Sequence, residues 1–203
     1  MQILKTLLLS TVMLFTLTGE RLDGLEVGDK AVNFNLKNID GSTVSLSTTK
    51  SVKGYILVFT CNTCPYSVLY EDRIIALHEK YADLGFPVIA IQPNDPQKSP
   101  GDSFTNMQKR AEEKAFPFPY LIDEAQEVTR TYGATNTPHV YILNKLSDDN
   151  YRVEYIGAID NNSRNPQAAS KHYVEEAVDN ILLGKQISIT STKAIGCTIK
   201  WGN

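Results

Sequence analysis

Residues 55–59 (Tyr-Ile-Leu-Val-Phe) form an uninterrupted apolar run, and residues 88–91 (Val-Ile-Ala-Ile) form a second one. Short runs of this kind are typical of strands that are covered on both faces. Between the two runs, Ile74, Leu77 and Tyr81 recur at helical spacing. A strand, a helix and another strand in this order predict an α/β fold, in which helices pack on a central sheet.

The rest of the chain supplies further elements of the same kinds. Alternating apolar residues on both sides of Asp40 and Gly41 predict a β-hairpin over residues 31–46. Two late strands flank a turn-like segment at residues 147–150, so an antiparallel edge is expected and the sheet should be mixed. Residues 185–203 show no long helical pattern and are expected to form a tail. The other expected strands are 120–122, 139–143 and 151–156, and the other expected helices are 102–115, 124–132 and 173–183.

The N-terminal segment differs from the rest of the chain. Lys5 ends a short polar start, residues 6–17 are dominated by Leu, Val, Met and Phe, and polar sequence begins at Glu20. This is the layout of a secretory signal peptide, with a buried N-terminal helix as the alternative. The run is shorter than the roughly 20 residues that span a bilayer. We predict a signal peptide over residues 1–19, one domain over residues 20–203, and export to the periplasm or another extracytoplasmic compartment without a remaining membrane span.

The composition limits the classes of partner. The chain is 42% apolar and 21% charged, as in a soluble globular protein. Its formal net charge is −3, and phosphate binding requires clustered Lys and Arg. The one basic cluster, around Lys109 and Arg110, is diluted by Glu112 and Glu113. These observations argue against a nucleic-acid partner.

Cys61 and Cys64 lie at the junction between the first apolar run and a helix expected to begin at Pro65. Backbone N–H groups of a first helical turn point at such sulfurs, and the helix dipole favours negative charge there. Because the thiolate is the reactive form of cysteine, this position predicts a redox-active pair. A disulfide over so short a loop would contribute little as a structural staple. No metal site and no cofactor are predicted, since a structural zinc site requires four ligands and the histidines show no ligand spacing.

A second motif completes a family resemblance. Thr137 and Pro138 precede the expected strand that begins at residue 139. A CxxC pair followed by a Thr-Pro strand resembles the thioredoxin superfamily. The hairpin, Phe118-Pro119-Tyr120 and the tail residues 192–201 (Thr-Lys-Ala-Ile-Gly-Cys-Thr-Ile-Lys-Trp) resemble its redoxin branch, the AhpC/TSA group and its peroxiredoxin-like relatives. The resemblance covers nearly the whole chain after the signal peptide.

The resemblance implies a thioredoxin fold: a mixed central sheet flanked by helices, with an N-terminal β-hairpin and a C-terminal tail. It implies that Pro138 is cis and faces the cysteines, and that the Thr137 backbone binds an extended substrate segment as an added strand. The chain also departs from the family pattern at two positions near the pair. Ser67 stands where thiol reductases of the TlpA/ResA type often have Glu, so the group that accepts the proton of Cys64 is unidentified. Cys61 aligns with the peroxide-activating Thr of peroxiredoxins.

The implied activity is thiol–disulfide exchange. Cys61, expected to be the more exposed sulfur, attacks a substrate disulfide, and Cys64 then resolves the mixed disulfide. The implied partners are protein disulfides or dithiols and an upstream redox partner.

Two other activities compete with this interpretation. One is peroxide reduction, with Cys64 as the reacting sulfur. The other is copper delivery of the Sco type, with His139 as a third ligand, although those relatives have one more residue between their cysteines. The third cysteine, Cys197, is either a packed or free tail thiol, a resolving partner for Cys61 or Cys64, or the site of an intermolecular bridge.

Overall fold

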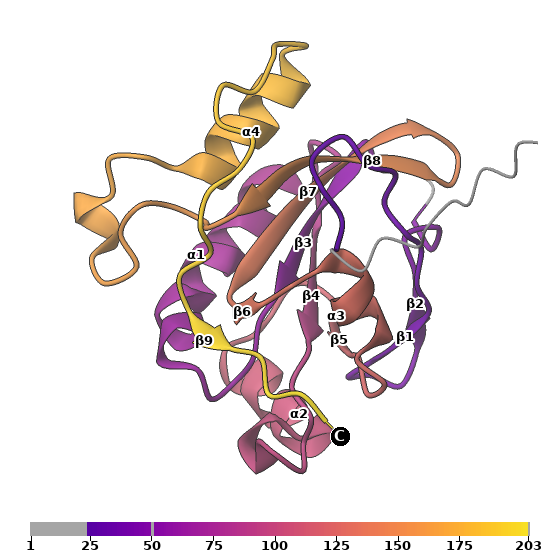
Figure 1. Ribbon diagram of the computed structural model, residues 1–203, viewed down its shortest axis with the longest axis vertical. Helices are drawn as coiled ribbons and strands as arrows, with labels where there is room; N and C mark the ends of the chain where they lie inside the picture. Colours follow the sequence, from indigo (N-terminus) through magenta and orange to yellow (C-terminus); the bar gives the residue numbers. More distant parts are fainter. Residues whose placement is uncertain (1–23, 50, 203) are drawn as a thin grey trace, which may run out of the picture.

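The computed structural model describes residues 24–49 and 51–202, and the predicted signal peptide lies outside them. A seven-stranded sheet crosses the molecule in the order β2-β1-β5-β4-β3-β7-β8, and β6 and β9 form a separate two-stranded sheet (Figure 1). The strands are β1 (Leu36–Asn38), β2 (Thr43–Val44), β3 (Gly54–Phe59), β4 (Val88–Gln92), β5 (Tyr120–Ile122), β6 (Asn136–Thr137), β7 (His139–Ser147), β8 (Asn150–Gly157) and β9 (Cys197–Thr198). The helices are α1 (Pro65–Tyr81), α2 (Phe104–Glu113), α3 (Glu127–Tyr132) and α4 (Tyr173–Leu182), with short 3-10 turns at Pro100–Asp102 and Pro166–Ala168.

The sheet is mixed, as predicted. Strands β3, β4 and β5 are parallel to one another, whereas β7 pairs antiparallel with β3 and β8 pairs antiparallel with β7. The β1–β2 hairpin pairs antiparallel with β5 and forms the opposite edge. The predicted α/β fold with a hairpin before the first central strand is therefore confirmed, although the hairpin strands are shorter than expected.

Both faces of the sheet are covered, which explains the continuous apolar run in β3. Every residue of β3 is buried. Ile56 and Val58 face the layer that contains α1, α2 and α4, while Leu57 and Phe59 face the layer that contains α3 and residues 25–34. The alternation follows from the period of two in a strand. A strand with no solvent-facing side cannot show the polar alternation of a half-exposed one.

Helix α1 begins where the sequence indicated. Cys64 has extended backbone angles and occupies the N-cap, and Pro65 occupies the first helical turn, where its missing N–H costs nothing. The chain passes from the end of β3 to the start of α1 through residues 60–64. This short loop places both cysteines at the carboxyl edge of the parallel strands, where α/β proteins commonly place their ligand-binding and active sites.

Three features differ from the sequence prediction. Helix α3 begins at Glu127 because Gln126 adopts a left-handed conformation, with φ of 57°. The tail contains a strand that was not predicted, β9. It pairs antiparallel with β6, which was also not predicted. Tail and β6 meet beside the carboxyl edge of the sheet (Figure 1).

Within residues 24–49 and 51–202, no helix is both long and apolar enough to span a membrane.

Candidate active site

The two cysteines lie under the surface at the start of α1. Cys61 and Cys64 are each 3% exposed, whereas Cys197 is partly exposed. The expectation that Cys61 is the more exposed sulfur is therefore wrong. The tail strand β9 was not part of that expectation; it pairs with β6, and the backbone N–H of Cys197 in β9 lies against Cys64.

A buried carboxylate holds the loop between the two cysteines. Asp102 is completely buried, and its Oδ1 accepts the backbone N–H groups of Asn62 at 2.8 Å and Thr63 at 3.0 Å. Its Oδ2 accepts from the Thr63 hydroxyl at 2.8 Å, the Asn94 amide at 2.8 Å and the Ser99 hydroxyl at 2.6 Å. Hydrogen bonds to a charged group are stronger than neutral ones, so this carboxylate determines the path of the loop. Sequence reasoning treated Asp102 only as a helix cap.

The side chain of Asn62 is also held from two sides. The Tyr120 hydroxyl donates to Asn62 Oδ1 at 3.0 Å, and Asn62 Nδ2 donates to the Gly101 carbonyl at 3.0 Å. Gly101 packs directly on Thr63, because a Cβ there would lie 2.4 Å from the Thr63 methyl group. Both residues between the cysteines are thus held by Gly101 and Asp102, which precede α2, and Asn62 is also held by Tyr120 of β5.

Thr137 and Pro138 face the cysteines, and the peptide bond between them is cis, as the resemblance implied. The Thr137 hydroxyl lies 3.3 Å from Cys61 Sγ, and the Thr137 carbonyl oxygen lies 3.1 Å from Cys64 Sγ. The structure therefore brings together four of the residues that the sequence singled out.

Cys197 joins the same cluster. Its backbone N–H donates to Cys64 Sγ at 3.3 Å, and its thiol is within hydrogen-bonding reach of the Cys64 sulfur. In the pairing of β9 with β6, Cys197 lies opposite Thr137. The tail thiol is thus packed against Cys64, whereas the sequence had left its place open.

The cluster favours negative charge on Cys64. The Cys61 thiol donates to Cys64 and lowers its pKa, the Cys197 thiol and the N–H groups of Ser67 and Cys197 add to this effect, and burial opposes it. The protonated Cys64 thiol donates to the Thr137 carbonyl at 3.1 Å. The pKa of Cys64 falls to about 4. The hydrogen bond to Cys64, burial and the nearby Asp102 raise the pKa of Cys61. Burial and Cys64 raise the pKa of Cys197 to about 11.

Other polar residues near the pair have different partners. Ser67 is buried, and its hydroxyl lies 4.0 Å from Cys61 Sγ. Glu71 pairs with Arg110 through two hydrogen bonds of 2.7 Å and 2.6 Å. Burial lowers the pKa of His139 to about 4, so its imidazole is neutral at pH 7. In the described part of the chain, no group of three or more His, Cys, Asp or Glu side chains is arranged to hold a metal ion.

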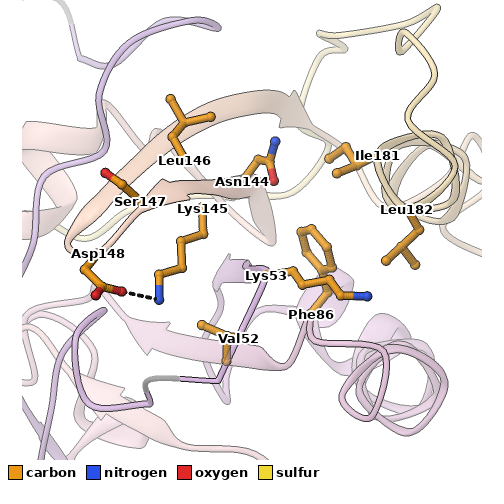
Figure 2. Close-up of a pocket in the computed structure, with 10 residues that line it drawn as sticks. All are labelled: Val52, Lys53, Phe86, Asn144, Lys145, Leu146, Ser147, Asp148, Ile181 and Leu182. Atoms are coloured by element: carbon orange, nitrogen blue, oxygen red, sulfur yellow. Dashed lines mark ion pairs between the residues drawn. The ribbon is translucent and has the colours of Figure 1, made fainter.

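A separate hollow of about 530 Å³ lies at the other end of the sheet (Figure 2). It is bounded by Lys53 and Phe86, by the β7–β8 turn with the ion pair of Lys145 and Asp148 at 2.9 Å, and by Leu182 at the end of α4. Lys53 precedes β3, whereas the cysteines follow it. The hollow therefore does not open onto the sulfurs.

A strand, a CxxC loop, a helix and a cis Thr-Pro loop facing the sulfurs define a redoxin of the thioredoxin superfamily. The chain belongs to the AhpC/TSA family, whose model matches residues 27–155. The match includes both cysteines of the pair and the Thr-Pro loop, and it ends before the tail.

Individual relatives agree with this assignment. The chain is 26% identical over 118 residues to the thiol-disulfide oxidoreductase ResA of Halalkalibacterium halodurans, and the match covers 58% of this chain and 62% of that protein. The chain thus spans less than two thirds of this relative. An uncharacterized conserved protein from Geobacillus kaustophilus, known from its crystal structure, is 35% identical in sequence, with a TM-score of 0.79. The match covers 87% of this chain and 93% of that protein's chain. A hypothetical protein from Sinorhizobium meliloti is 30% identical, with a TM-score of 0.79 and coverages of 89% and 97%.

Replacement of Asp102 by Ala should destabilise the reduced protein by about 2–4 kcal/mol, because the buried N–H groups of Asn62 and Thr63 lose their acceptor. Urea denaturation measures the change. The control is Asp83→Ala, at an exposed position after α1, which should change the free energy of unfolding by less than about 0.5 kcal/mol. Equal unfolding midpoints for the two variants would show that Asp102 does not hold the loop.

The reduced protein should contain one thiolate that persists well below neutral pH. Because the pKa of Cys64 is lowered to about 4, the thiolate should be lost only as the pH falls through about 4, whereas a free cysteine is protonated below about pH 8.5. The ultraviolet absorbance of the thiolate measures this titration. Cys64→Ser should remove the low-pH transition, and a wild-type transition near that of free cysteine would contradict the charge assignment.

Proposed function

We propose that this protein is a thiol–disulfide oxidoreductase that works through Cys61 and Cys64. The observation that carries the proposal is that both sulfurs lie against Thr137 at the start of α1, with Cys61 Sγ 3.3 Å from its hydroxyl and Cys64 Sγ 3.1 Å from its carbonyl oxygen. Donors also converge on Cys64. Lowering a thiol pKa raises the fraction of thiolate at neutral pH and makes the sulfur a better leaving group. A pair in which one sulfur is charged and the other protonated is prepared for exchange in either direction.

The proposed substrates are protein disulfides or dithiols, with a separate redox partner that restores the pair. Thr137 lies against both sulfurs, and its cis bond to Pro138 shapes the loop at this wall of the site. Val68 and Leu69 on α1 and Ile195 in the tail are 40%, 46% and 45% exposed, and all three are close in sequence to a site cysteine. Exposed apolar side chains on α1 and in the tail are available for contact with a protein surface.

Disulfide exchange is favoured over the two competing activities. A thiol, Cys61, stands at the position where the peroxiredoxin motif has its peroxide-activating Thr. The copper interpretation required His139 as a third ligand, and the nitrogen Nδ1 of this buried residue instead accepts the N–H of Thr135 at 3.4 Å. Among the described residues, His139 and the cysteines also do not form a group arranged to hold a metal ion. These observations support the dithiol as the reacting unit.

Replacement of Cys64 by Ser should lower the rate of insulin disulfide reduction by more than about a hundredfold, because the charged sulfur of the pair is lost. Turnover with a chemical reductant as electron source measures the effect. Cys61→Ser should also slow turnover strongly, since the buried partner of Cys64 is removed. If Cys64→Ser reduced insulin at the wild-type rate, the assignment of the pair would be wrong.

We also propose that residues 1–19 direct export and are removed. The support is the apolar run that follows Lys5 and the start of polar sequence at Glu20. The mass of the protein purified from an expressing bacterium should correspond to a chain that begins near residue 20, and the protein should be found in the periplasmic fraction. A full-length protein in the cytoplasmic fraction would overturn this proposal.

A further inference from the structure

The edge that a substrate strand would use is already occupied. Strand β9 pairs antiparallel with β6, so that Thr198 lies opposite Asn136 and Cys197 lies opposite Thr137. The Asn136 side chain donates to the Gly196 carbonyl at 3.0 Å. The tail of this chain therefore takes the position that added-strand recognition would give to a substrate peptide.

The fit between the tail and the Thr-Pro loop is close. A Cβ on Gly196 would lie 2.0 Å from the Thr137 carbonyl oxygen and 3.1 Å from Pro138 N. Contacts below 3.0 Å require a shift, and here the neighbouring atoms are backbone. Only glycine permits this close contact between the two backbones. Gly196 therefore allows the tail to lie directly against the Thr-Pro loop that faces the sulfurs.

The tail is held on both sides of this contact. Before it, the Thr192 hydroxyl lies 2.6 Å from the Tyr155 hydroxyl and accepts the Ala158 N–H at 2.9 Å. After it, Ile199 is buried and donates its N–H to the Thr135 carbonyl at 3.1 Å. Asn94, Gln126 and Asp95 bind the backbone of residues 200–202. A segment with this many bonds is part of the folded domain.

Access to the pair is restricted in consequence. Cys61 and Cys64 are 3% exposed, and the cavity that reaches Cys61 between Phe116 and Tyr120 holds about 10 Å³, the size of a single water. Exchange requires that an external sulfur reach the sulfur it attacks. Of the three cysteines in the described chain, Cys197 alone is partly exposed while also touching Cys64.

We propose that Cys197 is the sulfur through which external thiols and disulfides exchange with the buried Cys61–Cys64 couple. The proposal rests on the thiol–disulfide activity proposed above, and it specifies the route. The site then recognises a sulfur that can reach the surface of β9, and it does not require a substrate strand at β6.

In the oxidised protein, the Cys197 thiolate attacks Cys64; the Cys64–Cys197 bond forms, the Cys61–Cys64 bond breaks, and Cys61 takes up the proton that Cys197 gave up. An external thiolate then attacks Cys197 and releases Cys64 as the thiolate that its donors stabilise. A second external thiol attacks the external sulfur of this mixed disulfide, so that an external disulfide leaves and Cys197 is regenerated. Two external thiols are oxidised and the Cys61–Cys64 disulfide is reduced; the reverse sequence reduces an external disulfide.

The first test follows reduction of the oxidised full-length protein by glutathione. Wild type should carry the glutathione adduct on Cys197, located by peptide mass mapping after acid quenching. Cys197→Ser should be reduced at least about tenfold more slowly, because direct attack on the buried couple remains the only route. The matched control is Thr198→Ser, whose exposed side chain points to the other face of β9; it should react at the wild-type rate.

The second test uses variants that separate the relay from simple shielding. Oxidised Cys61→Ser should contain a Cys64–Cys197 disulfide within one chain. Gly196→Val should push the tail away from Thr137, and adding it to Cys197→Ser should restore much of the lost rate by exposing the pair. Thermal unfolding of each variant shows whether it is folded.

The outcomes are distinguishable. An unaltered rate for Cys197→Ser, with the adduct on Cys61 or Cys64, would overturn the relay but leave the oxidoreductase activity intact. Two free thiols or an intermolecular dimer in oxidised Cys61→Ser would also overturn it. If wild type never forms a Cys61–Cys64 disulfide, the proposed function itself fails.

Discussion

The site depends on the hydrogen bonds that Asp102 accepts from the loop between the two cysteines. Two consecutive N–H groups, those of Asn62 and Thr63, converge on one buried oxygen. This fixes the loop in the conformation that carries the chain from the end of β3 into α1. Because a buried carboxylate requires partners for both oxygens, the carboxylate and the loop stabilise each other.

From this loop the electrostatics of the sulfurs follow. With the first turn of α1 in place, the Ser67 N–H and the Cys61 thiol reach Cys64, and the tail adds the Cys197 N–H. Donors to the charged form lower a thiol pKa, whereas burial without donors raises it. The two cysteines lie in one buried cluster, yet their pKa values move in opposite directions because the donors converge on Cys64.

The tail links the site to the rest of the fold. Strand β9 covers the sulfurs, and Ile199, which follows it, belongs to the apolar layer on the α3 face of the sheet. The same segment therefore completes the core and lies against the proposed redox pair. Burial of the couple protects it from adventitious reaction, and the partly exposed Cys197 provides the proposed connection with external thiols.

The sequence by itself determined the strands and helices of the main sheet, the place of Cys61 and Cys64 at a strand–helix junction, and the Thr-Pro motif, because these depend on local periodicity and capping; the short strands β6 and β9 left no such pattern. Only the tertiary structure decided which sulfur takes the charge. It also decided that Asp102 binds a loop 40 residues away and that Cys197 meets Cys64 across 133 positions. Contacts over such separations arise from packing of distant segments, which leaves no periodic trace in a single sequence.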